Sequence, residues 1–199
     1  MNAVSNIMSP SPSASPGRPT VTVVVGNPKP QSRTRAIGVT IAERCGAVVF
    51  EQPSQIEVIE LSELAAVLLG WGDQRVAAAK ELVLGSDLVV IASPVFKASV
   101  PGLLKAFFDQ FGRDELDARA VVPVMVGAGA AHTLAVEHHL RPILIEIGAC
   151  CPTRGLYVLD SEIEGLDEAM TEWLRRWGPP LAAVVNAAGH RRATERGDR

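Results

Sequence analysis

Residues 20–34 read TVTVVVGNPKPQSRT, and this stretch decides the fold because an apolar run passes directly into a polar loop with two prolines. The run from Val21 to Val25 is β-branched and too short to favour a helix, which is typical of a strand buried on both faces of a parallel sheet. After the loop, residues 36–42 (AIGVTIA) have the spacing of an amphipathic helix. The stretch therefore predicts a strand, a loop and a helix N-terminus in succession.

A helix N-terminus beside such a loop is suited to bind an anion, because free backbone N–H groups and the helix dipole both favour a phosphate there. Ser32 and Thr34 carry hydroxyls that can donate to phosphate oxygens, and Lys29, Arg33 or Arg35 can neutralise the charge. From these residues alone, an N-capped helix with solvated basic side chains remains the alternative.

The composition predicts one domain at residues 20–188, between a disordered leader at 1–19 and a disordered basic tail at 189–199. The leader has no apolar core of a signal peptide. A net charge of −3 gives no electrostatic reason to expect nucleic acid, and the apolar runs are too short to span a membrane. The three cysteines have no metal-ligand spacing, so we expect no metal and a cytoplasmic location.

Strand and helix patterns alternate along the chain. Strands are expected at 21–25, 56–61, 87–92, 120–126 and 154–159, and later helices at 74–84, 102–111, 131–147 and 167–187. Ser93-Pro94 is expected to end the third strand, and Pro123 argues against full pairing of the fourth. The order predicts an α/β domain with a five-stranded parallel sheet and helices on both faces.

Three loops follow the ends of strands, at 26–35, 93–102 and 127–132, so they are expected at one edge of the sheet, where such folds bind ligands. The second loop holds a rigid Pro-Val-Phe segment suited to a flat ring edge. The third is Gly-Ala-Gly, which lets the backbone come close to a ligand. Simple turns remain the alternative for both, and His132 would contact a ligand or bond the helix terminus.

Three segments resemble the NAD(P)H-dependent FMN reductases of flavodoxin-like fold, above all the reductase components of two-component alkanesulfonate monooxygenases. The segments are 26–34 (GNPKPQSRT), 92–105 (ASPVFKASVPGLLK) and 127–142 (GAGAAHTLAVEHHLRP). The resemblance implies a flavodoxin-like three-layer sandwich. It also implies an enzyme that reduces FMN with NADPH or NADH and supplies reduced flavin to a partner monooxygenase.

The same resemblance assigns FMN-binding residues to the three loops. The resemblance assigns the FMN phosphate to Lys29, Ser32, Arg33 and Thr34. Asn27 belongs to the same loop and occupies a position where the family commonly has a serine. It assigns the edge of the isoalloxazine ring to Pro94, Val95, Phe96 and Lys97. It assigns the other side of the ring to Gly127, Ala128 and Gly129, with His132 nearby.

His138 and His139 lie in a segment that resembles a particular helix of these reductases. In the reductases, that helix contains one inserted residue, which forms a π-bulge at a tetramer interface. His138 aligns with the inserted position, and a homo-oligomer (dimer or tetramer) is implied. Adjacent helical residues point about 100° apart, so joint metal ligation is not expected. Histidines at a surface or interface without a bulge remain the alternative.

Hydride transfer to a flavin needs little from side chains, so no catalytic acid or base is expected. FMN would act as a substrate or a loosely held cofactor. A flavin-retaining quinone or azo reductase is the alternative enzyme, and a flavodoxin-like electron carrier the alternative of another class. The residues do not choose between NADH and NADPH.

Overall fold

The computed structural model describes residues 17–197, so residues 1–16 of the expected leader lie outside the described residues. Its centre is a five-stranded, fully parallel sheet with strand order β2-β1-β3-β4-β5. This is the flavodoxin-like order of a doubly wound sheet, which confirms the predicted fold. The strands are β1 (Thr20–Val25), β2 (Gln55–Glu60), β3 (Leu88–Pro94), β4 (Ala120–Gly127) and β5 (Leu156–Leu159).

Burial explains why these segments are strands. The central strands β3 and β4 are buried at every position, and β1 at every position after Thr20. Covered on both faces, they read as continuous apolar runs, whereas the edge strands β2 and β5 are mostly half-buried.

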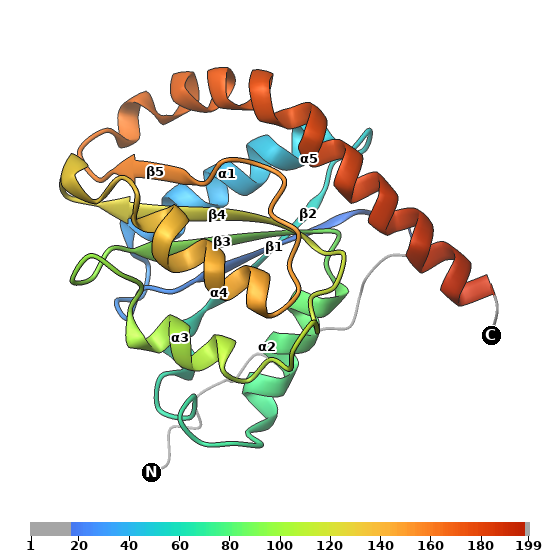
Figure 1. The fold of residues 1–199 in the computed structure, drawn as a ribbon, viewed down its shortest axis with the longest axis horizontal. Coiled ribbons are helices and arrows are strands. Elements are labelled where there is room, and N and C mark those ends of the chain that lie inside the picture. The colour runs from blue at the N-terminus through green and yellow to red at the C-terminus, as the bar shows by residue number, and fades with distance from the viewer. Residues whose placement is uncertain (1–16, 198–199) are drawn as a thin grey trace, which may run out of the picture.

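Five α-helices cover the sheet in two layers: α1 (Arg33–Val49), α2 (Gln74–Gly85), α3 (Gly102–Phe108), α4 (Arg141–Glu146) and α5 (Leu166–Gly197). In Figure 1, α1 and α5 lie above the sheet and α2, α3 and α4 below it. Each layer buries its own apolar cluster against one face, so the molecule has two cores separated by the sheet. Short 3₁₀ turns occur at Leu61–Leu64, Ala130–His132 and Ile163–Gly165, and a π-helical turn at Val136–Leu140.

The structure differs from the expectation for Pro94 and agrees with the expectation for Pro123. Pro94 does not follow β3 but is its last residue, in register with Val126 of β4. Pro123 lies inside β4, and the pairing of β4 with β5 begins one residue later, at Val124. The missing N–H of Pro123 therefore falls outside the β4–β5 ladder, which lets a proline occupy a central strand.

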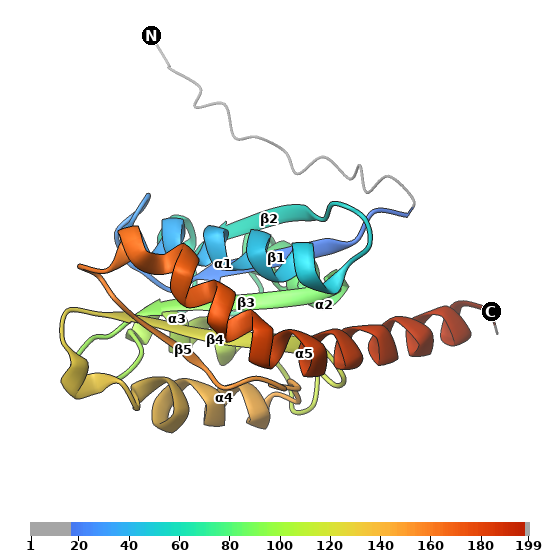
Figure 2. The ribbon, with the colours of Figure 1, turned by 90° about the horizontal axis from the view of Figure 1, so that it is seen from above.

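The last helix corrects the expected tail. α5 continues through Gly197, whereas sequence patterns end it near Ala187 and predict disorder from residue 189. Figure 2 shows its last turns extending past the rest of the domain. Apolar periodicity could not reveal these turns, because Ala193 is the one apolar residue between positions 190 and 197. None of the helices in residues 17–197 is both long and apolar enough to cross a membrane.

Gly38 lets α1 lie close to the sheet, and its replacement tests this packing. A Cβ at Gly38 would lie 2.8 Å from Cβ of Ala92 and 3.0 Å from Cγ1 of Val23, both on buried strands. We expect Gly38→Ala to lower the free energy of unfolding by about 1–3 kcal/mol, measured by urea denaturation. Gly85→Ala is the control, because a Cβ there meets nothing within 4 Å; equal losses in the two variants would contradict this packing.

Candidate functional site

A cleft of about 390 Å³ opens at the carboxyl edge of the sheet, where the loops after β1, β3, β4 and β5 gather (left side of Figure 1). Ten of the thirteen residues predicted for the site line it: Asn27, Lys29, Ser32, Arg33, Thr34, Pro94, Val95, Phe96, Gly127 and Ala128. Lys97, Gly129 and His132 do not line it. Gln31, Val126 and Asp160 line it without having been predicted. Three loops far apart in sequence thus form one site.

The first loop presents the N-terminus of α1 to the cleft. Ser32 is the N-cap, and its Oγ accepts a hydrogen bond from the Arg35 N–H at 3.3 Å. The Arg33 and Thr34 N–H groups belong to the first helical turn, where no intrahelical acceptor exists. They are therefore available to an anion, together with the positive end of the helix dipole.

Asn27 shapes this loop. Its Nδ2 donates to Thr34 Oγ1 at 3.0 Å, and its Oδ1 accepts from the Lys29 N–H at 2.9 Å. Because the amide ties the start of the loop to the first turn of α1, Asn27 supports the loop through its side chain. Asn27, at the position where the resembled reductases commonly have a serine, thus fixes the backbone of the first loop beside the cleft.

The three cations of the loop have different surroundings. Arg35 Nε lies 3.0 Å from Oε1 of Glu60, whose other oxygen accepts from the Gln31 N–H at 2.8 Å. Arg33 Nη1 lies 3.3 Å from Oδ2 of Asp160. Lys29 forms no ion pair with the rest of the described chain. The cleft therefore receives its positive charge from Lys29 and, partly neutralised, from Arg33.

The second loop leaves β3 as a tight hairpin. Phe96 and Ser99 exchange backbone hydrogen bonds of 2.9 and 3.0 Å, and Lys97 and Ala98 between them have φ of 50° and 63°. Two positive φ values are typical of a type I′ turn, which usually takes glycine or asparagine. Lys97 sits at the tip of this turn, which is why it does not line the cleft, whereas Phe96 at its base does and is 47% exposed.

The third loop is held from β5. Tyr157 Oη donates to the Gly129 carbonyl at 2.6 Å, and the Asp160 N–H donates to the Gly127 carbonyl at 3.0 Å. A Cβ on Gly127 would lie 2.0 Å from Tyr157 Oη, whereas one on Gly129 would meet nothing within 4 Å. The close approach of the Tyr157 side chain to the backbone therefore requires glycine at position 127 but does not require it at position 129. Burial, followed by the charge of Asp160, raises the pKa of Tyr157 above its ordinary value.

Tyr157 and Asp160 are the functional residues that sequence reasoning missed. The signal was present, because a fifth strand was predicted and Asp160 directly follows it. The rule that assigned three loops to the carboxyl edge of a parallel sheet applies equally to the end of β5.

The π-helical turn at Val136–Leu140 contains His138, so the structure confirms the predicted bulge. Glu137 in this turn accepts from the Gly155 N–H at 2.7 Å and is paired with Arg141. Arg141 also donates to the carbonyls of Cys151 and Thr153. The hydrogen bond from Arg141 is the main reason that the pKa of Glu137 lies below its ordinary value. This ion pair ties the turn to the segment that leads into β5.

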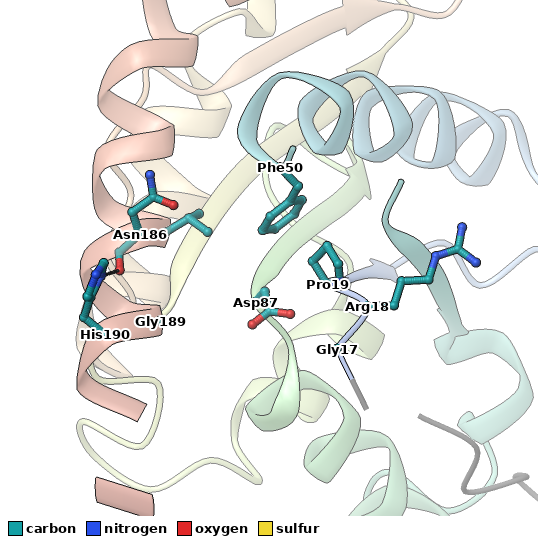
Figure 3. A pocket seen from close by; sticks show the side chains of 9 residues that line it. Gly17, Arg18, Pro19, Phe50, Asp87, Asn186, Gly189 and His190 are labelled. Carbon is teal, nitrogen blue, oxygen red and sulfur yellow. Dashed lines mark hydrogen bonds between the residues drawn. The ribbon is translucent and has the colours of Figure 1, made fainter. Parts of the chain in front are cut away.

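A second pocket, of about 530 Å³, lies at the amino edge of the sheet between the segment before β1 and the end of α5 (Figure 3). Asp87 in it accepts from the Thr20 N–H at 2.8 Å, and His190 Nδ1 bonds the Asn186 carbonyl at 2.7 Å. Doubly wound sheets bind ligands at the carboxyl edge, and α1 points its N-terminus there. The cleft of about 390 Å³ at the carboxyl edge, although smaller than this pocket, is therefore the candidate site.

Comparisons with known proteins agree with the geometry. The family model "NADPH-dependent FMN reductase" matches residues 19–164. The FMN reductase (NADPH) of Pseudomonas aeruginosa is 30% identical over 87% of this chain and 90% of its own. The NADH-dependent FMN reductase SfnF of Pseudomonas putida is 29% identical over 74% of this chain and 80% of its own.

Solved structures are similar as well. An oxidoreductase of Corynebacterium diphtheriae superposes with a TM-score of 0.75 at 28% identity, over 85% of this chain and 98% of its own. The apo NADH:FMN oxidoreductase EMOB superposes with a TM-score of 0.71 at 23% identity, over 84% of this chain and 89% of its own, which supports the fold. The family identified from the three segments is confirmed.

The contact between Gly127 and Tyr157 gives a prediction. Gly127→Ala must displace the Tyr157 ring and break its hydrogen bond to Gly129, so we expect weaker flavin binding, measured by fluorescence titration. Gly129→Ala is the matched control, expected to bind like the parent protein. In a Tyr157→Ala background, Gly127→Ala should cost much less, because residues in contact are not additive. An equal cost in both backgrounds would contradict the contact.

Proposed function

The chain belongs to the NADPH-dependent FMN reductase family, and we propose that it transfers a hydride from NADPH or NADH to FMN and supplies the reduced flavin to a partner monooxygenase. The observation that carries this proposal is the single cleft in which the three predicted loops meet. Its volume of about 390 Å³ lies within the range of small-molecule sites. One end is basic and the other has apolar walls, which fits a phosphorylated flavin.

The basic end suits the FMN phosphate. The N–H groups of Arg33 and Thr34 and the hydroxyls of Ser32 and Thr34 are donors, and Lys29 and Arg33 supply charge. Charge-assisted hydrogen bonds of this kind are the strong ones. Ser32 and Thr34 are 8% and 2% exposed, so both hydroxyls are held in place before any ligand arrives.

The other end suits the isoalloxazine ring. Pro94 and Val95 continue from β3, and the Val95 N–H donates to the Val126 carbonyl at 2.8 Å, which fixes this wall against β4. Phe96 adds an exposed aromatic face. Gly127 and Ala128 offer backbone groups, steadied by Tyr157, to the polar rim of a ring.

Bound FMN would supply the redox chemistry, since its ring accepts a hydride from nicotinamide. The residues of the chain bind and orient the two nucleotides, and backbone dipoles around Gly127 stabilise negative charge near the ring. Among residues 17–197, the cleft is lined by no histidine, cysteine or tyrosine, and by one carboxylate, Asp160, which is paired with Arg33. We therefore assign no catalytic acid or base.

The partner, the assembly and the location are further parts of the proposal. A monooxygenase as recipient rests on the resemblance to two-component systems. A dimer or tetramer rests on the π-helical turn, which carries interface contacts in the resembled reductases. Cys45, Cys150 and Cys151 are free thiols, which agrees with a reducing cytoplasm.

Oxidation of NADPH and NADH by flavin-stripped protein, with and without FMN under low oxygen, tests the proposal. We expect turnover that scales with added FMN and yields free reduced flavin. Retained flavin with turnover only after a quinone or azo dye is added would indicate the alternative reductase. Flavin binding without oxidation of either nucleotide would indicate an electron carrier.

The phosphate contacts give a prediction that uses two flavins. We expect Ser32→Ala with Arg33→Ala to weaken FMN by about ten- to a hundredfold, as charge-assisted hydrogen bonds contribute about 1.5–3 kcal/mol. Riboflavin, which lacks the phosphate, should change little and serves as the control. Equal losses for the two flavins would contradict the assignment of the phosphate to this loop.

The π-helical turn gives a prediction about flavin exchange. Deletion of His138 removes the extra residue and should return Val136–Leu140 to α-helical hydrogen bonding. If the turn keeps FMN exchangeable, the deletion variant should retain FMN after gel filtration. His138→Ala, which keeps the residue count, is the control and should release flavin normally. Unchanged exchange in the deletion variant would contradict this role.

A further inference from the structure

Asp160 provides the only carboxylate among the described residues that line the cleft. It follows β5 directly and faces the N-terminus of α1. Arg33 Nη1 lies 3.3 Å from its Oδ2 and donates to its backbone carbonyl at 3.2 Å. A negative charge therefore sits beside a guanidinium that is suited to bind the phosphate.

The position of this charge is fixed by the backbone. The Asp160 N–H donates to the Gly127 carbonyl at 3.0 Å, so the residue is anchored to the third loop as well as to β5. One third of its side chain is exposed, against two thirds of that of Arg33. Asp160 is thus the better-anchored partner of the pair, and Arg33 is the partner that has to reorient when an anion enters.

The remaining cations cannot replace Arg33 fully. Arg35 is engaged by Glu60, which also accepts the Gln31 N–H and does not line the cleft. Lys29 remains, together with the N–H groups of α1. An entering phosphate must therefore share Arg33 with Asp160. Its negative charge must also lie close to the negative charge of the Asp160 carboxylate.

We propose that Asp160 sets the affinity of the cleft for phosphorylated flavin, weakening it by competing for Arg33 and by repelling the phosphate. This inference rests on the proposed function, since it concerns the same site. A protein that passes reduced flavin to a partner has to release it, and a carboxylate at the phosphate end lowers affinity without altering the contacts to the ring. Asp160 is an affinity-determining residue and takes no part in hydride transfer.

Asp160→Asn tests the proposal because it keeps the shape of the side chain and removes its charge. We expect FMN to bind about tenfold more tightly, as removal of one nearby like charge in a partly exposed site allows. Reduced FMN should leave more slowly, and riboflavin affinity should stay unchanged. Asp167→Asn is the matched control, because Asp167 of α5 pairs at 3.2 Å with Arg44 of α1, the helix that also carries Arg33, and Asp167 does not line the cleft.

An Arg33→Gln background separates competition from positioning. If Asp160 repels the phosphate, Asp160→Asn still tightens FMN when Arg33 is absent. If Asp160 acts only by competing for Arg33, the substitution tightens FMN in the parent protein and changes nothing in the Arg33→Gln background. If Asp160 instead only positions Arg33, the substitution weakens FMN in the parent protein, and that result would overturn the proposal. Asp160→Glu, which keeps the charge, should bind FMN like the parent. Failure of both the parent and Asp160→Asn proteins to bind FMN would overturn the proposed function and this inference together.

Discussion

The N-terminus of α1, presented at the carboxyl edge of a buried parallel strand, is the constraint on which the site depends. β1 is covered on both faces and paired on both sides, so its end is fixed within the sheet. Gly38 lets α1 return closely over β1 and β3. The first turn of α1 is consequently held at the end of β1, and its unpaired N–H groups face the loops after β3, β4 and β5. This packing therefore favours an anion at the start of α1 before any side chain is considered.

The sequence predicted the parts of the site that follow from strong local patterns. A β-branched run, a proline-rich loop and a capping serine define β1 and the start of α1 without tertiary information. The resemblance assigned Lys97 to the site together with Pro94, Val95 and Phe96, but a hairpin with two positive φ values places Lys97 at the tip of a turn. No glycine marks that turn, so residue type gave no warning. The π-helical turn had no local signature either and was predicted from resemblance alone.

The charges of the cleft are consistent with the proposal that it binds flavin reversibly. Arg35 and Arg33 are each paired with a carboxylate, Glu60 behind the loop and Asp160 within the cleft. The donors left for an anion are the backbone N–H groups at the start of α1, the hydroxyls of Ser32 and Thr34, and the ammonium group of Lys29. In the proposed function, these groups would hold the phosphate mainly by hydrogen bonds, with one cation, unpaired within residues 17–197, to assist them. The hydrogen bonds from Tyr157 and Asp160 fix the third loop, which the proposed function places beside the flavin ring.

A crystal structure of the protein with FMN tests most directly whether the carboxyl-edge cleft is the flavin site. We expect phosphate oxygens within hydrogen-bond distance of the Arg33 and Thr34 N–H groups, and the ring against Pro94, Val95 and Gly127. A pocket of about 530 Å³ also lies at the amino edge, beside Asp87 and His190. FMN bound there, or in the cleft with its phosphate away from α1, would contradict the assignment.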